Sequence, residues 1–285
     1  LAAIGAAQVP YARIDEGIDL YYELTGPEEG PVVIQFGGGL FGRHNFGFVN
    51  DGFRDAGFRL LSFDARGYGA STSPREWYTI EGWAADGAKL LDALSLDRVL
   101  VHGTSMGGMI AIAFTALHGD RTIAACADVA FAKPDVYWRT LFRVWRRMAE
   151  SMPWDDFADH VTTQAVGAAF LESEAGANTF ELVRSVIGVN DPYTVRQACI
   201  AMEEMDLSEL VPAIERPLLM TNGTYDILCP PVLAPSGLGA RRMAELNPRI
   251  VTHEFPDIGH ADLLECPDDA VRVVSAFFRD ALAEG

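Results

Sequence analysis

The stretch VLVHGTSMGGMIAIAFT, Val99 to Thr115, places a single serine between two glycines, after one apolar run and before another. The run before the serine is typical of a buried strand, and the run after it is typical of a helix. A chain that doubles back between them needs glycine where Cβ atoms would collide, so Gly103 and Gly107 indicate a sharp strand-to-helix turn. Such a turn holds the hydroxyl of Ser105 outward in a strained conformation. The sequence therefore predicts Ser105 as a nucleophile.

Strand-like and helical runs alternate along the rest of the chain. An opening hairpin is predicted around Glu16-Gly17, where apolar and polar residues alternate on both sides. Continuous apolar strands are then predicted to end at Phe36, Asp64, Gly103, Phe131, Gly223 and Pro256. Apolar spacings of three and four residues predict helices at 79–96, 109–119, 239–247 and 267–284. This order predicts an α/β fold, a mostly parallel central sheet with helices on both faces.

One segment, residues 133–207, interrupts this alternation. It contains no clear strand and is rich in large apolar residues, so it is predicted to be a helical cap inserted between two parts of the core, residues 1–132 and 208–285. Most of its aromatic residues are expected to pack between helices. Trp138, Phe142 and Trp145 are predicted to line a substrate pocket under the cap. The first ten residues are expected to form a loose or docking tail.

A serine hydroxyl needs a base, and His260 is the best candidate. It follows a strand, lies in a loop after a glycine and precedes the final helix. The other five histidines fit less well, because they lie within predicted strands or helices, in the cap, or in the loop after the first buried strand: His44, His102, His118, His160 and His253.

The base needs a carboxylate to orient its ring. Asp226 follows the penultimate strand in a turn-forming loop and is the favoured acid. Asp128 is the alternative, because the loop after its strand can also reach the histidine. Asp257 and Asp262 are close to His260 in sequence and are expected to be solvated loop charges.

The oxyanion that forms on attack needs N–H donors. The string QFGGGLFGRHNF, which follows a buried strand, offers three consecutive glycines whose amides can approach a ligand closely. Gly38, with Gly39 as the alternate, and Met106, which follows the serine, are the predicted donors. His44 in the same loop is a predicted pocket residue. Arg43, His44 or Arg143 is a candidate to hold a substrate carboxylate.

Five motifs in the same order resemble the α/β-hydrolase fold superfamily. They are the glycine-rich Phe36–Gly42, DARGYGAS at Asp64–Ser71, GTSMGG at Gly103–Gly108, GTYD at Gly223–Asp226 and IGHADLLE at Ile258–Glu265. The resemblance implies Ser105, Asp226 and His260 as nucleophile, acid and base, and implies no metal and no organic cofactor. TSMGG is similar to enol-lactonases and small esterases, and the glycine-rich loop is similar to the hydrolases that cleave carbon–carbon bonds in ring-cleavage products. The sequence departs from many members in having Phe36 in place of a histidine, and from the latter subfamily in having Ala261 in place of an aromatic residue.

Composition restricts the partners. The formal net charge of −18 repels phosphate backbones and anionic membranes, so nucleic acid and membrane are excluded as expected partners. The four cysteines are widely scattered and show no metal-ligand spacing, which predicts free thiols in a reducing, cytoplasmic compartment. A small-molecule substrate is the expected partner, and a homodimer is left open.

The function that these residues predict is hydrolysis of a small apolar ester or lactone by a serine enzyme. Two alternatives stay open at this point. One is hydrolysis of a carbon–carbon bond in a vinylogous 1,5-diketone. The other, from a different class of protein, is a ligand-binding receptor that kept the fold without turnover. Haloalkane dehalogenation is disfavoured, because it uses an aspartate where Ser105 stands.

Overall fold

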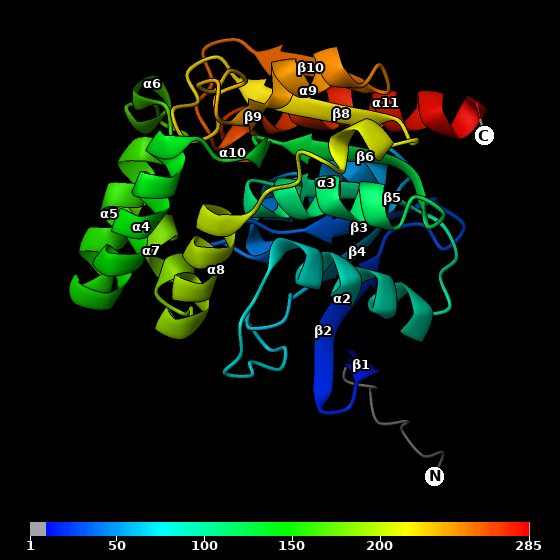
Figure 1. Ribbon diagram of the computed structural model, residues 1–285, viewed down its shortest axis with the longest axis horizontal. Helices are drawn as coiled ribbons and strands as arrows, with labels where there is room; N and C mark the ends of the chain where they lie inside the picture. Colours follow the sequence, from blue (N-terminus) through cyan, green and yellow to red (C-terminus); the bar gives the residue numbers. More distant parts are fainter. Residues whose placement is uncertain (1–9, 285) are drawn as a thin grey trace.

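A computed structural model describes residues 10–284 and has an eight-stranded central sheet at its centre (Figure 1). The strand order is β1-β2-β4-β3-β5-β6-β8-β10. The β1–β2 and β2–β4 pairs are antiparallel, and every other neighbouring pair in this sheet is parallel. The strands are β1 (Tyr11–Asp15), β2 (Ile18–Thr25), β3 (Val32–Phe36), β4 (Arg59–Phe63), β5 (Val99–Thr104), β6 (Thr122–Asp128), β8 (Leu218–Gly223) and β10 (Ile250–Phe255). The predicted fold class is confirmed.

Helices cover both faces of this sheet, as a parallel sheet with two apolar faces requires. On one face, α2 (Ile80–Ala93) and α3 (Met106–Leu117) pack against each other and against the strands. On the other face, the short α1 (Asn50–Asp55) and α11 (Pro267–Glu284) enclose a second apolar cluster that contains Phe53. The remaining core helices are short: α9 (Ala240–Leu246), which packs against β10, and α10 (Asp262–Glu265). The side chains that form this second cluster are buried.

The strand predicted to run to Phe131 ends earlier. β6 stops at Asp128, because Val129 takes a positive φ of 46° and turns the chain out of the sheet. The Val129 N–H donates to the Thr221 carbonyl oxygen at 2.8 Å and holds this turn. The next residues form a separate short strand, β7 (Phe131–Lys133), which pairs antiparallel with β9 (Leu238–Gly239). A positive φ at a β-branched residue is rare, and the sequence carries no signal for it.

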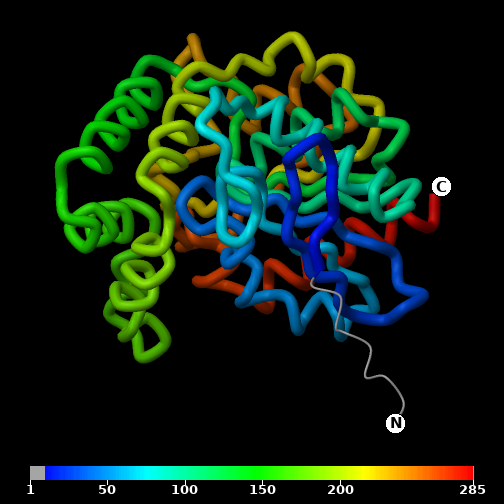
Figure 2. Tube along the Cα trace, turned by 90° about the horizontal axis from the view of Figure 1, so that it is seen from below, coloured from blue at the N-terminus to red at the C-terminus, as the bar shows by residue number. Residues whose placement is uncertain are grey.

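Five α-helices lie between β7 and β8, and they stand together at one side of the sheet in both views (Figures 1 and 2). Within this group, α4 and α8 pack most extensively against each other. Within this layer the apolar faces turn inward, and the Trp145 and Phe157 rings meet edge to face at 6.3 Å between centroids. The helices are α4 (Val136–Ser151), α5 (Trp154–Ala165), α6 (Ala168–Leu171), α7 (Thr179–Ile187) and α8 (Pro192–Glu204).

The predicted amino-terminal tail lies almost entirely outside the described residues. Within residues 10–284, helices of membrane-spanning length and hydrophobicity are absent.

Candidate active site

Ser105 occupies the turn between β5 and α3 with φ 57° and ψ −121°. A Cβ at Gly103 would lie 2.0 Å from the Gly107 carbonyl oxygen, and a Cβ at Gly107 would lie 1.8 Å from the Phe36 carbonyl oxygen. Both distances are far inside van der Waals contact, so only glycine fits on either side of the serine. The positive φ costs about 1–3 kcal/mol for a non-glycine residue, and the packed strand and helix sustain it.

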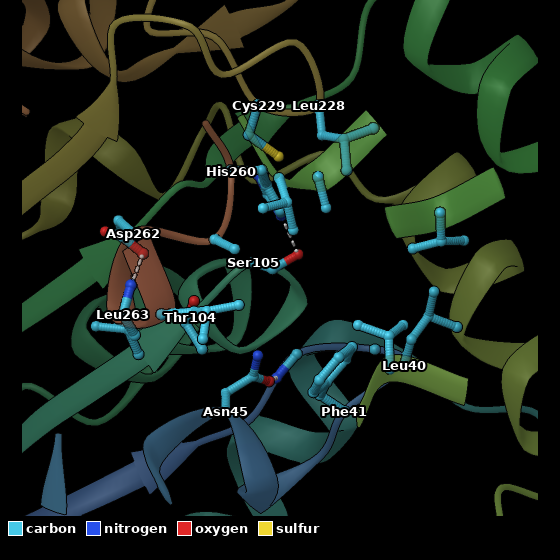
Figure 3. A pocket seen from close by; sticks show the side chains of 18 of the residues that line it. Leu40, Phe41, Asn45, Thr104, Ser105, Leu228, Cys229, His260, Asp262 and Leu263 are labelled. Carbon is cyan, nitrogen blue, oxygen red and sulfur yellow. Dashed lines mark hydrogen bonds between the residues drawn. The ribbon is translucent and has the colours of Figure 1, made fainter. Parts of the chain in front are cut away.

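His260 faces this serine from the loop between β10 and α10. Its Nε2 lies 3.0 Å from Ser105 Oγ, and the side chains point toward each other at the cavity wall (Figure 3). The backbone N–H of His260 donates to the carbonyl oxygen of Ala165, at the end of α5, at 2.7 Å. The histidine is therefore held from two sides, by the serine and by the helical layer.

Asp226, in the loop after β8, holds the other ring nitrogen of this histidine. His260 Nδ1 lies 3.0 Å from Asp226 Oδ2 and 3.2 Å from Oδ1. The carboxylate is buried, and its Oδ1 accepts the backbone N–H groups of Leu228 and Cys229, both at 2.8 Å. These two donors fix the carboxylate, which in turn orients the ring. Ser105, His260 and Asp226 thus form one continuous chain of hydrogen bonds.

The alternative acid, Asp128, and the two aspartates expected to be solvated loop charges, Asp257 and Asp262, lie elsewhere. Asp128, the alternative acid, is bonded to Nε2 of His102 and makes no hydrogen bond to His260. Asp257 is exposed, as expected. Asp262 is not a solvated loop charge: it is 1% exposed and its Oδ1 accepts the Leu263 N–H at 2.9 Å. Burial, and then the nearby Asp128 carboxylate, raise the pKa of Asp262 well above its ordinary value.

The glycine loop after β3 brings Gly38 against the serine. A Cβ on Gly38 would lie 3.4 Å from Ser105 Cβ. However, the Gly38 N–H donates to Asn45 Oδ1 at 2.8 Å. The amides of Gly39 and Met106 donate no hydrogen bond to any group of residues 10–284. Asn45 is the residue that the sequence reasoning missed, because that reasoning took the polar residue one position earlier in the same loop.

Ser105 and His260 face a cavity of about 100 Å³ between the sheet and the helical layer, whereas Asp226 lies outside the cavity wall. Its walls combine the glycine loop, the two turns that carry the serine and the histidine, and apolar residues of α4, α5, α7 and α8. Phe142 and Trp145 line it, as do Met109, Val161, Val183, Met202, Leu228 and Leu263.

Two predicted pocket residues, His44 and Trp138, lie outside this cavity. The 3-10 helix η1 (Arg43–Phe48) turns His44 outward to solvent and directs Asn45 inward. Trp138 packs between Phe131 and Tyr137. Successive residues of a 3-10 helix lie about 120° apart, so a one-residue difference decides which side chain of η1 lines the cavity.

The arginines expected to hold a substrate carboxylate are already paired. Arg43 contacts Asp64 at 2.9 Å and Glu23 at 3.1 Å, and Arg143 contacts Glu203 at 2.8 Å. Among the described residues, the cavity wall contains neither lysine nor arginine. The wall therefore offers a carboxylate no opposite charge.

The helical layer is tied to the histidine loop. The Gly167 N–H donates to Glu265 Oε2 at 3.1 Å, and the same oxygen accepts the Gly259 N–H at 3.2 Å. Burial raises the pKa of Glu265, and the backbone donors counteract part of this effect. The Glu265 carboxylate therefore accepts from both the segment after α5 and the residue before His260. These two hydrogen bonds connect the helical layer to the loop that carries the histidine.

One group of side chains in the described part of the chain has metal-ligand composition. The ligand atoms of His102, Cys126 and Asp128 lie within 4.8 Å of one another, and all three residues are buried. Their polar atoms are bonded to each other: Asp128 accepts from His102 Nε2 and from the Cys126 thiol at 3.1 Å. The remaining polar atom, His102 Nδ1, is buried and has no hydrogen-bond partner among the described residues.

A strained serine on a strand-to-helix turn, bonded to a histidine and then to an aspartate from two later loops, is the arrangement of α/β hydrolases. The alpha/beta hydrolase fold family model matches residues 30–267, and the chain belongs to that family. The protein is accordingly an enzyme of the hydrolase class.

Three relatives illustrate the likeness. The AB hydrolase superfamily protein YisY of Bacillus subtilis is 26% identical over 76% of this chain and 80% of its own. An esterase from Thermogutta terrifontis of known structure is 26% identical in sequence to this chain, and the two structures superimpose with a TM-score of 0.80 over 93% of this chain and 94% of the esterase. The structure of the enol-lactonase from Burkholderia xenovorans LB400 is 25% identical, with a TM-score of 0.84 over 95% of this chain and 100% of its own.

Proposed function

We propose that the protein is a serine hydrolase that cleaves small, uncharged, apolar esters or lactones through an acyl-enzyme. The observation that carries this proposal is the chain of hydrogen bonds from Ser105 through His260 to Asp226, which opens onto an apolar cavity. The esterase and the enol-lactonase among the similar structures support the reaction class.

In this reaction His260 removes the proton from Ser105 Oγ as that oxygen attacks the substrate carbonyl carbon. Asp226 stabilises the imidazolium that forms and keeps the proton-accepting Nε2 toward the serine. The imidazolium then gives its proton to the leaving alkoxide, and the acyl group stays on Ser105. Water, deprotonated by the same nitrogen, releases the acid and regenerates the serine.

The negative oxygen that forms on attack needs donors at the serine. We assign the Met106 N–H, at the first turn of α3, as one of them, since the positive end of the helix lies there. The second donor comes from the glycine loop. The Gly38 amide is engaged by Asn45, whereas the Gly39 amide is free, so Gly39 is the donor in this arrangement.

Substitutions of Asn45 test this assignment. Asn45→Ala removes the acceptor that holds the Gly38 amide, and we expect kcat to fall about 5- to 10-fold, the effect of one net hydrogen bond. Asn45→Asp keeps an acceptor but adds a negative charge beside the developing oxyanion, so we expect about a 100-fold loss of kcat. Steady-state kinetics with p-nitrophenyl butyrate measure both. An aspartate variant as active as the alanine variant would place this side chain away from the developing charge.

The charge of the cavity selects the substrate class. An unpaired carboxylate costs several kcal/mol to bury, and the protein as a whole is negatively charged. We therefore expect p-nitrophenyl butyrate to have a kcat/KM about 100-fold or more above that of mono-p-nitrophenyl succinate. The two esters match in length and differ by the free carboxylate. Equal values would show that the substrate is not selected by charge.

Hydrolysis of a carbon–carbon bond is the competing reaction. A ring-cleavage product that carries a carboxylate would meet the same uncompensated charge in this cavity. Incubation of the enzyme with such a dienol, followed by loss of its visible absorbance, measures this reaction. Turnover of the dienol above that of the neutral ester would favour the carbon–carbon reaction and reject the ester proposal.

We also infer that the enzyme works in the cytoplasm. The cysteines support this inference, because those in the described residues form no disulfide. Burial raises the pKa of Cys126, Cys199 and Cys229, so these thiols are protonated and unreactive. Fractionation of cells that produce the protein would locate it.

A further inference from the structure

Four buried polar side chains lie next to the candidate active site and outside the hydrogen-bond chain of the proposed triad, and one of them, Asp262, also lines the cavity. His102 and Thr221 are 0% exposed, and Asp128 and Asp262 are 1% exposed. They come from β5, β6, β8 and α10, one from each. β5 leads into Ser105, β8 leads into the loop of Asp226, and α10 follows His260. Buried polar groups are costly unless they are bonded, so a network at this place needs a physical explanation.

Hydrogen bonds join these four side chains in a row. Asp128 Oδ2 accepts from His102 Nε2, and Asp128 Oδ1 accepts from the Thr221 hydroxyl at 2.7 Å. The same Thr221 oxygen lies 3.2 Å from Asp262 Oδ2. Asp262 Oδ1 accepts the N–H of Leu263 at 2.9 Å, in the helix that follows His260. The row thus spans the carboxyl ends of three adjacent parallel strands, β5, β6 and β8, and ends in the histidine loop.

The protons in this row can be assigned by counting donors. A threonine hydroxyl has one proton, and Thr221 uses it in the shorter bond, to Asp128. The second contact, to Asp262 Oδ2, is then a hydrogen bond only if Asp262 carries a proton and donates it. Asp128 accepts from His102, Thr221 and Cys126, which suits a carboxylate. The row therefore contains one charged and one neutral carboxyl group.

The electrostatic surroundings agree with this assignment. Burial raises the pKa of Asp128, but the charge of His102 and the three donors outweigh burial and hold it below its ordinary value. Burial, and then the Asp128 charge, raise the pKa of Asp262. The titratable groups that face Asp262 or its partner Asp128 are His102, Cys126, Asp128, Asp226 and Cys266.

We propose that Thr221 and Asp262 are positioning residues that hold the His260 loop at the Ser105 turn, with Asp262 acting as a neutral hydrogen-bond donor. The inference rests on the proposed serine chemistry. Asp262 is two residues after His260, and Thr221 lies in the strand that leads into Asp226. Loss of the Thr221–Asp262 bond frees the start of α10 from the sheet, and the imidazole then samples positions beyond reach of the serine oxygen.

If Asp262 is neutral, an asparagine at this position should replace it with little loss of activity. In Asp262→Asn, the amide oxygen still accepts the Leu263 N–H, and the amide nitrogen donates to Thr221. We therefore expect this variant to keep kcat within about twofold of the parent. Asp262→Leu has a similar volume but neither function, and we expect kcat to fall about 10- to 100-fold with KM nearly unchanged, since a small misplacement of a catalytic group costs that much.

Thr221 gives the matched pair. Thr221→Ser keeps the hydroxyl and should retain activity, whereas the isosteric Thr221→Val should lose about 10-fold in kcat. Measurements on the whole protein are kcat, KM, the pH profile of kcat/KM and the thermal unfolding midpoint. A merely structural role would lower the unfolding midpoint and leave kcat per folded molecule unchanged.

The results for these variants distinguish the positioning role, the neutral state of Asp262 and the proposed serine chemistry from one another. Retained activity in Thr221→Val overturns the positioning role. A loss in Asp262→Asn as large as in Asp262→Leu overturns the neutral donor and assigns a charged carboxylate. If Asp262→Leu does not fold, the asparagine and valine variants still decide the question. Failure of Ser105→Ala to abolish turnover would reject the proposed function, which is a different result from either of these.

Discussion

Replacement of Ser105 by alanine is expected to lower kcat for p-nitrophenyl butyrate by about 10⁴- to 10⁶-fold, the loss that follows removal of a serine nucleophile. The reason is that Ser105 Oγ is the hydroxyl bonded to His260 Nε2, and His260 alone cannot form the acyl-enzyme. Alanine tolerates the positive φ of this turn no worse than serine does, so the fold should be kept. Stopped-flow or steady-state assays measure the change.

A matched serine supplies the control. Ser185 is exposed on α7, and its hydroxyl bonds only to the Leu182 carbonyl oxygen, so Ser185→Ala should retain full activity. A fluorophosphonate probe should label the parent and the Ser185 variant but not Ser105→Ala. An unlabelled parent without esterase activity would favour the ligand-binding alternative, and an active Ser105→Ala would remove the nucleophile from the account.

Replacement of Asp226 by asparagine should cost about 10⁴-fold in kcat. The carboxylate now accepts from His260 Nδ1 and is itself held by two backbone N–H groups. If the asparagine oxygen still accepted those two backbone N–H groups, the amide nitrogen of the side chain would face His260 Nδ1 and donate to it. The imidazole would then carry its proton on Nε2, where it cannot take one from the serine. The pH profile of kcat/KM and the unfolding midpoint together separate this tautomer effect from misfolding.

Asp257→Asn is the control for that substitution. Asp257 is an exposed acid three residues before His260, and asparagine accepts its positive φ of 60°. We expect activity within about twofold of the parent. Nearly full activity in Asp226→Asn would contradict the role of Asp226 and would favour Asp128, the alternative acid predicted from the sequence.

Local sequence was sufficient where the physical cause is local. The turn at the serine follows from Gly103 and Gly107, because backbone atoms would overlap any Cβ at these positions. The strand and helix around it follow from apolar periodicity, and the closing helix spans residues 267–284 as the spacing predicts. The periodicity and the overlap of Gly103 with the nearby Gly107 act over a few residues and could be read without a structure, whereas the overlap at Gly107 is with the distant Phe36 carbonyl oxygen.

Side-chain environments could not be read in this way. Asp262 was expected in solvent because it lies in a polar loop, yet Thr221, 41 residues away in sequence, buries it under β8. Val129 ends β6 through a bond to the same distant residue. His44 and Asn45 are neighbours in sequence, and the rotation of η1 decides that only Asn45 faces the cavity. Each of these depends on packing between segments far apart in the chain.

The amino-acid sequence by itself therefore determined the α/β class, the strained turn at Ser105 and the short set of residues able to act with it. Those conclusions depend on backbone sterics and on periodicity, which act over a few residues. Only the tertiary structure decided that Asp226 bonds to His260 and that Asn45 accepts from the Gly38 amide. It also decided that, among the described residues, the cavity wall contains neither lysine nor arginine. These are properties of contacts between distant segments, and distance in space is set by the packed fold.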